Sequence, residues 1–233
     1  MTGKVVIVTG GGRGIGRAIC ERFASAGAQV VAASRSAKEL KETSSAIESS
    51  GGKCHSHVTD VGNSADLQKL IADTVSRFGR VDVLVNCAGV APKAPFDQME
   101  PVLFDTIRAV NIDAVYHACR FVWPIMKKQG GGVIITISSI ASADPFPGFA
   151  AYGASKAWLN LWTRALAEEG RPQNIRVFAV APGAVETRML RDAFPTFPSD
   201  QTLLPSDVAG AVFGLCGEDF RYATGETVFV KKS

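Results

Sequence analysis

The chain has 233 residues, of which 46% are hydrophobic and 20% are charged, and its formal net charge is +3. These are ordinary globular values; no apolar run approaches the roughly 18 residues of a membrane span, and the dispersed basic residues exclude a nucleic-acid footprint. Five cysteines and three histidines lack the spacing of a metal site or a disulfide framework, and no export signal precedes the first strand-like run, so we expect a cytoplasmic protein.

Strand-like apolar runs alternate with helical patterns along the whole chain. In chain order, we predict strand 5–8, helix 15–26, strand 29–33, helix 38–50, strand 53–58, helix 63–78, strand 81–85, helices 101–110 and 114–128, strand 133–137, helix 152–169, strand 176–180, helix 205–216 and strand 227–230. Residues 188–204 form the one long irregular stretch. This alternation favours a parallel sheet covered on both faces. We therefore predict a single α/β domain over residues 1–233, doubly wound, with about seven strands and helices on both faces.

A glycine-rich segment joins the first predicted strand to the first predicted helix. It reads Thr-Gly-Gly-Gly-Arg-Gly-Ile-Gly over residues 9–16. Glycines allow a tight turn and a close approach of the backbone to a pyrophosphate, and a helix N-terminus offers free N–H groups. A glycine-rich segment alone is often only a turn, but between a strand and a helix it predicts a dinucleotide-binding loop.

Tyr152 and Lys156 lie four residues apart in a predicted helix. This spacing puts both side chains on one helix face. A nearby lysine charge favours the phenolate and lowers a tyrosine pKa from its usual value of about 10. The pair therefore predicts an acid–base group that works near neutral pH, although the same spacing is also common on solvated helix faces.

Further motifs follow in a fixed order. They are Thr9-Gly-x-x-x-Gly-x-Gly16, Asn86-x-Ala88-Gly89, Asn111, Ser138-Ser139, Tyr152-x-x-x-Lys156, and Pro182-Gly183 followed by Thr187. Together they resemble the short-chain dehydrogenase/reductase family over nearly the whole chain, in particular its members similar to 3-oxoacyl-[acyl-carrier-protein] reductases. The resemblance implies one Rossmann-type domain that interconverts a carbonyl group and a secondary alcohol by hydride transfer.

The resemblance also implies catalytic roles. Tyr152 is expected to be the acid–base residue, and Ser139 to hydrogen-bond the carbonyl oxygen. Lys156 would hold the nicotinamide ribose and lower the Tyr152 pKa, while Asn111 would hold a water that links Lys156 to solvent. Neighbouring strand residues face opposite ways, so only one of Ser138 and Ser139 can point at Tyr152. The family spacing selects Ser139. Taken singly, Ser139 and Asn111 are also typical capping residues.

The implied cofactor is NADP(H). The second predicted strand ends in Ser34-Arg35, where NAD-binding relatives carry an acidic residue, and Arg13 lies in the glycine loop. Two guanidinium groups favour the 2′-phosphate, although both could be plain surface arginines. The implied cofactor-binding residues are Gly10, Arg13, Gly14, Ile15, Gly16, Ser34, Arg35, Asp60, Val61, Asn86, Ala88, Gly89, Tyr152, Lys156, Pro182, Gly183, Val185 and Thr187. Among them, Asp60 would accept from the adenine amino group, and Val185 and Thr187 would hold the carboxamide.

Few residues of the sequence bear on the substrate. Four apolar side chains either line a substrate pocket or belong to ordinary packing: Phe146, Phe149, Met189 and Phe194. A small-molecule ketone or alcohol is expected, with an acyl thioester left open. If an acidic carrier protein delivers it, a basic rim is needed. The candidates are Lys127, Lys128, Arg171 and Arg176, with scattered surface charges as the alternative.

Two helices are expected to lie in a subunit interface. The faces of 114–128 and 152–169 with Val115, Val122, Trp158 and Trp162 look apolar and exposed, and relatives pair these helices, so we expect a homodimer or homotetramer. Two other functions stay open, a non-enzymatic NADP-binding regulator and a sugar-nucleotide epimerase or dehydratase. The former would be expected to lack one of the four catalytic residues, and the latter to have another glycine spacing.

Overall fold

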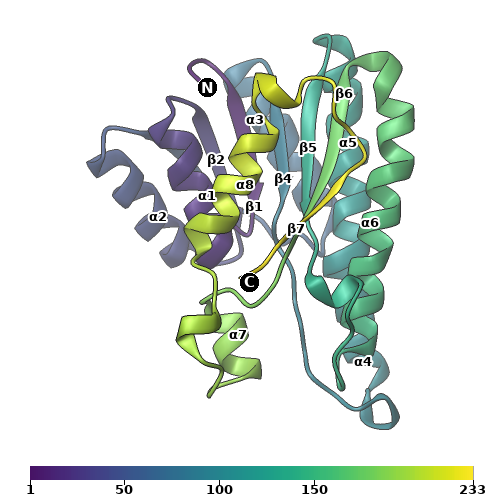
Figure 1. The fold of residues 1–233 in the computed structure, drawn as a ribbon. Helices are drawn as coiled ribbons and strands as arrows, with labels where there is room; N and C mark the ends of the chain where they lie inside the picture. Colours follow the sequence, from purple (N-terminus) through teal and green to yellow (C-terminus); the bar gives the residue numbers. More distant parts are fainter. Residues whose placement is uncertain (233) are drawn as a thin grey trace.

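Seven parallel strands form the centre of the computed structural model, which describes residues 1–232. The strands are β1 Val5–Thr9, β2 Gln29–Ser34, β3 Lys53–Val58, β4 Val83–Asn86, β5 Gly132–Ile137, β6 Ile175–Pro182 and β7 Thr227–Val230. They lie in the order β3-β2-β1-β4-β5-β6-β7 (Figure 1). The order reverses direction between β1 and β4, which confirms the predicted doubly wound sheet.

Helices cover both faces of this sheet. The longer ones are α1 Gly14–Ser25, α2 Ala37–Ser49, α3 Ser64–Phe78, α4 Pro101–Arg108, α5 Ala114–Lys128, α6 Ala150–Gly170 and α8 Pro205–Leu215, with a short α7 at Arg188–Ala193. Alternation along β1 sets the two cores, because Val6 and Val8 pack with α1, α2 and α8, while Ile7 packs with α3, α5 and α6. Complete burial of such a side chain stabilises the fold by about 1.5–3 kcal/mol.

Most predicted elements are present, and some boundaries move. Strand β4 begins at Val83 rather than at residue 81, because Gln129 binds the backbone of Val81 on both sides: the Val81 N–H donates to its Oε1 at 3.3 Å, and its Nε2 donates to the Val81 carbonyl at 2.7 Å. Helix α6 begins two residues earlier than predicted. Tyr152 therefore lies within its first turn.

A five-residue π-helical turn, Ala109–Asp113, joins α4 to α5. Both helices predicted here are present, but the residues between them form a wider helical turn rather than a break. The residues on both sides keep right-handed helical backbone angles, so the helix runs on through a wider turn. Wider turns of this kind recur at functional sites. Asn111 lies at its centre and is almost completely buried.

A buried carboxylate ties the first strand to the start of β4. Asp82 accepts from both Nε and Nη2 of Arg80 at 2.8 and 2.6 Å, from the Val5 backbone N–H at 2.9 Å, and from Lys4 at 3.0 Å. Burial raises the pKa of Asp82, but these hydrogen bonds together lower it below its usual value. The ionised carboxylate is therefore the form that stabilises this end of the sheet.

The fold also bears on membranes and metals. Within residues 1–232, no helix has the length and apolar character required to cross a bilayer. Residues 1–232 contain no cluster of three or more histidine, cysteine, aspartate or glutamate side chains that could hold a metal ion.

Candidate active site

The glycine loop lies at the carboxyl end of β1, close to the point where the strand order reverses. Gly10 has a φ of +70°, and a Cβ there would lie 3.0 Å from the Ala88 backbone. A Cβ on Gly16 would collide with the carbonyl oxygen of Gly10. These two glycines are therefore required by the close passage of the loop, whatever it binds.

The start of α1 fits an anionic pyrophosphate. Arg13 is its N-cap residue but makes no capping hydrogen bond through its side chain, and the first turn of the helix holds no acidic residue. The N–H groups of a first helical turn have no partners within the helix, and the helix dipole favours a negative charge there. Gly14 and Ile15 open this turn, so the loop could hold a dinucleotide as the sequence predicts.

Thr9 ties the ends of β1 and β4 together beneath the loop. Its Oγ1 accepts from the backbone N–H groups of Cys87 at 3.1 Å and Ala88 at 3.2 Å. Asn86 is buried, and its Nδ2 lies 3.6 Å from the Cys119 sulfur. The Asn86–Gly89 motif is thus anchored on both sides and lies directly beside the glycine loop.

Asn111 holds the segment that follows this motif. Its Oδ1 accepts from the Val90 N–H at 3.0 Å, and its Nδ2 donates to the Val90 carbonyl at 3.0 Å and to Ser155 Oγ at 3.1 Å. These bonds link the π-helical turn, the segment after β4, and α6. The expected role of Asn111 in holding a water stays a prediction, but its side chain clearly positions backbone and helix.

Lys156 extends beneath the same segment. A Cβ on Gly89 would lie 3.6 Å from Lys156 Nζ and 3.5 Å from Asn111 Oδ1. Nζ donates to the Ile137 carbonyl at 2.8 Å, and the residue is 5% exposed. Burial lowers the pKa of Lys156 to about 8, against a weaker opposing effect of Cys87. A lysine at this depth needs a specific reason to be there.

Tyr152 lies one turn from Lys156 and is half-buried. Its ring centre is 5.6 Å from Lys156 Nζ. Burial raises the pKa of the Tyr152 phenol, and a hydrogen bond with Ser139 partly lowers it. This differs from the expectation that Lys156 lowers the phenol pKa. In the protein itself Lys156 points to the Ile137 carbonyl, and desolvation of the phenol dominates.

The two adjacent serines face opposite ways, as predicted. Ser138 Oγ donates to the Lys156 carbonyl at 3.1 Å and so braces α6. Ser139 Oγ accepts from the Ala141 N–H at 3.2 Å and lies beside the Tyr152 phenol. The pair Ser139 and Tyr152 therefore places two hydroxyl groups together at the carboxyl end of β5.

The segment after β6 returns to the glycine loop. Pro182 ends β6, and Val185 forms a bridge with Leu203 that closes the base of residues 188–204. Thr187 caps α7 by accepting from the Leu190 N–H at 3.3 Å. Its Cγ2 would lie 3.3 Å from a Cβ on Gly14. The start of α7 thus rests on the predicted cofactor loop.

Aromatic rings connect residues 188–204, the lid segment, to Tyr152. Phe149 is buried, stacks on Phe194 with centres 5.6 Å apart, and presents an edge to Tyr152 at 6.0 Å. Phe146 and Met189 are instead more than two-fifths exposed. Of the four apolar candidates, Phe149 therefore contacts the Tyr152 ring, Phe194 packs on Phe149, and the other two lie at the surface.

The adenosine end of the predicted site holds a residue that the sequence analysis missed. Arg35 is exposed, as expected of a phosphate ligand, and Ser34 is half-buried. Arg13, however, is paired with Glu39 of α2 at 3.1 Å. The missed residue is Glu39. Its position could have been inferred from the sequence, because it lies in the first turn of α2, which begins two residues after Arg35. On the other side of the site, Asp60 is exposed, and Val61 is buried.

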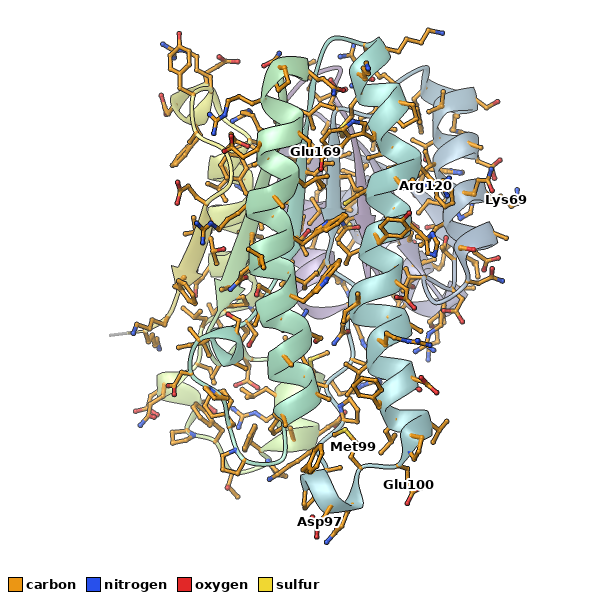
Figure 2. The ribbon with its side chains drawn as sticks, turned by 90° about the vertical axis from the view of Figure 1, so that its right-hand side faces the viewer. Lys69, Asp97, Met99, Glu100, Arg120 and Glu169 are labelled. Carbon is orange, nitrogen blue, oxygen red and sulfur yellow. The ribbon has the colours of Figure 1, made fainter. Side chains whose placement is uncertain are left out.

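The four basic candidates do not form a rim at the predicted site, which agrees with the alternative of scattered surface charges. Lys127 and Lys128 end α5, Arg171 follows α6, and Arg176 lies at the start of β6, so all four lie where the strands begin. In Figure 2, Glu169 marks the carboxyl end of α6. Asp97 and Glu100 lie at the opposite end of the molecule, close to the start of α6. Tyr152 lies at the start of α6. The basic residues are therefore at the wrong end of the molecule.

The predicted interface residues also differ from expectation. Val115 and Val122 are 4% and 0% exposed and belong to the core beneath α5. Trp158 and Trp162 are half-buried and stack on each other at 5.0 Å. The apolar periodicity of these helices thus reports mainly packing within the chain.

Comparisons with known proteins agree with this arrangement. The family model of the short chain dehydrogenases matches residues 4–197. Dehydrogenase/reductase SDR family member 4 of Homo sapiens is 36% identical over 99% of this chain and 87% of that protein. The 3-oxoacyl-[acyl-carrier-protein] reductase of Thermotoga maritima is 33% identical over 98% of this chain and 96% of its own length.

Solved structures match the whole fold. The 3-ketoacyl-(acyl-carrier-protein) reductase from Brucella melitensis, complexed with NADH, has a TM-score of 0.91 and 33% identity, covering 99% of this chain and 97% of that chain. A putative NAD(P) dependent gluconate 5-dehydrogenase from Beutenbergia cavernae, with bound NADP, has a TM-score of 0.93 and 32% identity, covering 99% and 96%.

Proposed function

Because this chain belongs to the short-chain dehydrogenase family, we propose that it is an NADP(H)-dependent oxidoreductase that interconverts a ketone and a secondary alcohol. One observation carries the proposal. Ser139, Tyr152 and Lys156 come from β5 and α6 to one place, at the carboxyl end of the sheet beside the glycine loop. Open parallel sheets bind their ligands at this end.

We assign Tyr152 the role of acid and base at the substrate oxygen. Because burial raises the pKa of its phenol, Tyr152 carries its proton at neutral pH. This is the form that a proton donor needs when a ketone is reduced. The Ser139 hydroxyl beside it would stabilise the negative charge that develops on the same oxygen.

Lys156 would hold the nicotinamide ribose and keep a positive charge near the phenol. Its burial, with Nζ donating to the Ile137 carbonyl and lying close to Gly89, supports this role. When bound, the nicotinamide cofactor supplies or accepts the hydride. The protein residues orient the two reactants and move the proton.

We propose NADP(H) rather than NAD(H) as the preferred cofactor. Ser34 ends β2 without a carboxylate that would repel a 2′-phosphate. Within residues 1–232, Arg35 has no ion-pair partner and is exposed, so its guanidinium is available to a phosphate. Relatives of known structure carry NADH in two cases and NADP in another, so the preference must come from residues of this chain.

The proposed substrate is a small ketone, with a 3-oxoacyl thioester as one candidate. Phe149 presents an apolar ring to Tyr152, and Phe194 of the segment 188–204 stacks on that ring. Such a surface suits the apolar part of a ketone. Similarity to acyl-carrier-protein reductases supports the thioester.

We also propose a cytoplasmic homo-oligomer. All five cysteines are free thiols, which fits a reducing compartment. Leu161 on α6 is 66% exposed and Tyr116 on α5 is 40% exposed, so α5 and α6 keep some apolar surface for a second copy. Light scattering of Leu161→Glu against the wild type would test this contact.

The function is tested by following reduced nicotinamide absorbance with a panel of ketones and 3-oxoacyl thioesters. Tyr152→Phe should lower kcat by about 10²–10⁴-fold and leave the Kd of NADPH nearly unchanged. Activity that survives this substitution would overturn the assignment of Tyr152. Binding of NADPH without turnover of any substrate would favour a regulator instead.

A further inference from the structure

The predicted 2′-phosphate ligand Arg13 already has a partner. Its Nη1 lies 3.1 Å from Glu39 Oε1. Glu39 belongs to α2, 26 residues further along the chain, so this contact depends on the packing of α2 against the glycine loop. A phosphate that binds Arg13 must compete with this carboxylate.

Glu39 is held firmly at this place. Its backbone N–H donates to Ser36 Oγ at 3.2 Å in the N-cap of α2. A Cβ on Gly12 would lie 3.0 Å from Glu39 Cβ and 2.9 Å from Ser34 Oγ, so the glutamate, the serine and the glycine loop meet around one point. The Glu39 side chain is 27% exposed, whereas that of Arg13 is 53% exposed. Arg13 is thus the freer partner.

A second cation lies near the same carboxylate oxygen. Arg188 Nη1, on the first residue of α7, lies 4.0 Å from Glu39 Oε1. If Arg13 turns away toward a phosphate, Glu39 keeps Arg188 as an ion-pair partner. The exchange of partners therefore leaves no half-buried charge without a counter-ion, which keeps its free-energy cost low.

We propose that Glu39 is a cofactor-discriminating residue, the counter-ion that the 2′-phosphate of NADP(H) displaces from Arg13. This inference rests on the proposed function, because it assumes that the dinucleotide binds with its adenosine ribose at Ser34-Arg35. Glu39 weakens NADPH binding by occupying Arg13 and by its own charge. It leaves NADH binding nearly unaffected, since NADH has no 2′-phosphate to pair with Arg13. Arg13 and Arg35 make the affinity for NADPH higher than that for NADH, and Glu39 makes this difference in affinity smaller.

The experiment measures the Kd of NADPH and of NADH by nicotinamide fluorescence, without any substrate. The proteins are the wild type, Glu39→Gln, Arg13→Ala and the double variant. Glu42→Gln is the matched control, because Glu42 is an exposed residue of the same helix and carries the same charge. Thermal unfolding of each variant checks that it is folded.

Glu39→Gln should tighten NADPH binding about two- to fivefold, the effect expected for one partly exposed ion pair. The Kd of NADH should stay the same, and Glu42→Gln should change neither value. Arg13→Ala should weaken NADPH binding. In the Arg13→Ala background, Glu39→Gln should have less than half of its original effect, because much of its influence passes through Arg13.

Three results would overturn the inference. If Glu39→Gln and Glu42→Gln change the Kd of NADPH equally, Glu39 acts only as one negative surface charge among others. If Glu39→Gln changes the Kd of NADPH as much in the Arg13→Ala background as in the wild type, Glu39 does not act through Arg13. A weaker NADH affinity with unchanged NADPH affinity would assign Glu39 to the ribose hydroxyls. A wild type that prefers NADH would refute the proposed cofactor but leave the effect of Glu39→Gln on NADPH binding measurable.

Discussion

Lys156 is a buried amine, and its replacement should change how the stability of the protein depends on pH. Burial lowers its pKa in the folded chain to about 8, whereas an unfolded lysine titrates at about 10.4. Between these values the unfolded state binds more protons than the folded state. The free energy of unfolding of the wild type therefore rises with pH across this window.

The size of the effect follows from the two pKa values. Between about pH 7 and about pH 10, the lysine should add about 2.5 kcal/mol to the free energy of unfolding. Lys156→Met has no such titration. The variant also removes the donor to the Ile137 carbonyl, which costs about 1–3 kcal/mol at every pH. The difference in stability between wild type and variant should thus grow with pH in favour of the wild type.

The assay is urea unfolding of the cofactor-free proteins at several pH values across this range. Groups other than Lys156 titrate in both proteins and largely cancel in the difference. Lys128→Met, on the exposed last turn of α5, is the matched control and should follow the wild type. A difference between wild type and Lys156→Met that stays constant with pH would refute the reasoning, because the buried amine would then have an ordinary pKa.

Three more predictions concern other parts of the chain. Asp82→Asn should lower the free energy of unfolding by about 2 kcal/mol at neutral pH in urea titrations, because its charge-assisted hydrogen bonds are lost while the partner cations stay solvated. Because the folded pKa of Asp82 is lowered, this stabilisation is present above about pH 4 and is lost as the pH falls through the folded pKa. Gly16→Ala should abolish NADPH binding in fluorescence titrations, whereas Gly62→Ala, whose Cβ would meet only Asp60 Oδ1 at 3.4 Å, should bind normally. Phe194→Ala should raise the KM of the ketone severalfold in steady-state assays without changing the Kd of NADPH. An unchanged KM would show that Phe194 does not contact the substrate.

Local sequence signals were enough for the sheet and for most of the site. Apolar strands of period two between helices of period 3.6 can bury both faces only as a parallel sheet. All strands of such a sheet run in the same direction, so their carboxyl ends lie at one edge. Ser139, the glycine loop and Pro182 are therefore brought to that edge. Opposite facing of neighbouring strand residues likewise separates Ser138 from Ser139.

Other features depend on contacts between distant parts of the chain. The π-helical turn around Asn111 leaves no periodic signal, because its extra residue is stabilised by bonds to Val90 and Ser155. The apolar faces of α5 and α6 were predicted as an interface, since periodicity alone cannot tell which neighbour covers a face. The basic residues were grouped by composition and lie at the opposite end of the sheet.

The sequence by itself determined the fold class, the order of elements and the residue types at the candidate site, because these follow from local spacing and chirality. Only the tertiary structure decided the electrostatics of the site. It directs the Lys156 ammonium at the Ile137 carbonyl, buries the Tyr152 phenol so that its pKa rises, and brings Glu39 to Arg13 across 26 residues. Charge interactions depend on distance and burial, and both are set by packing between elements that are far apart in the chain.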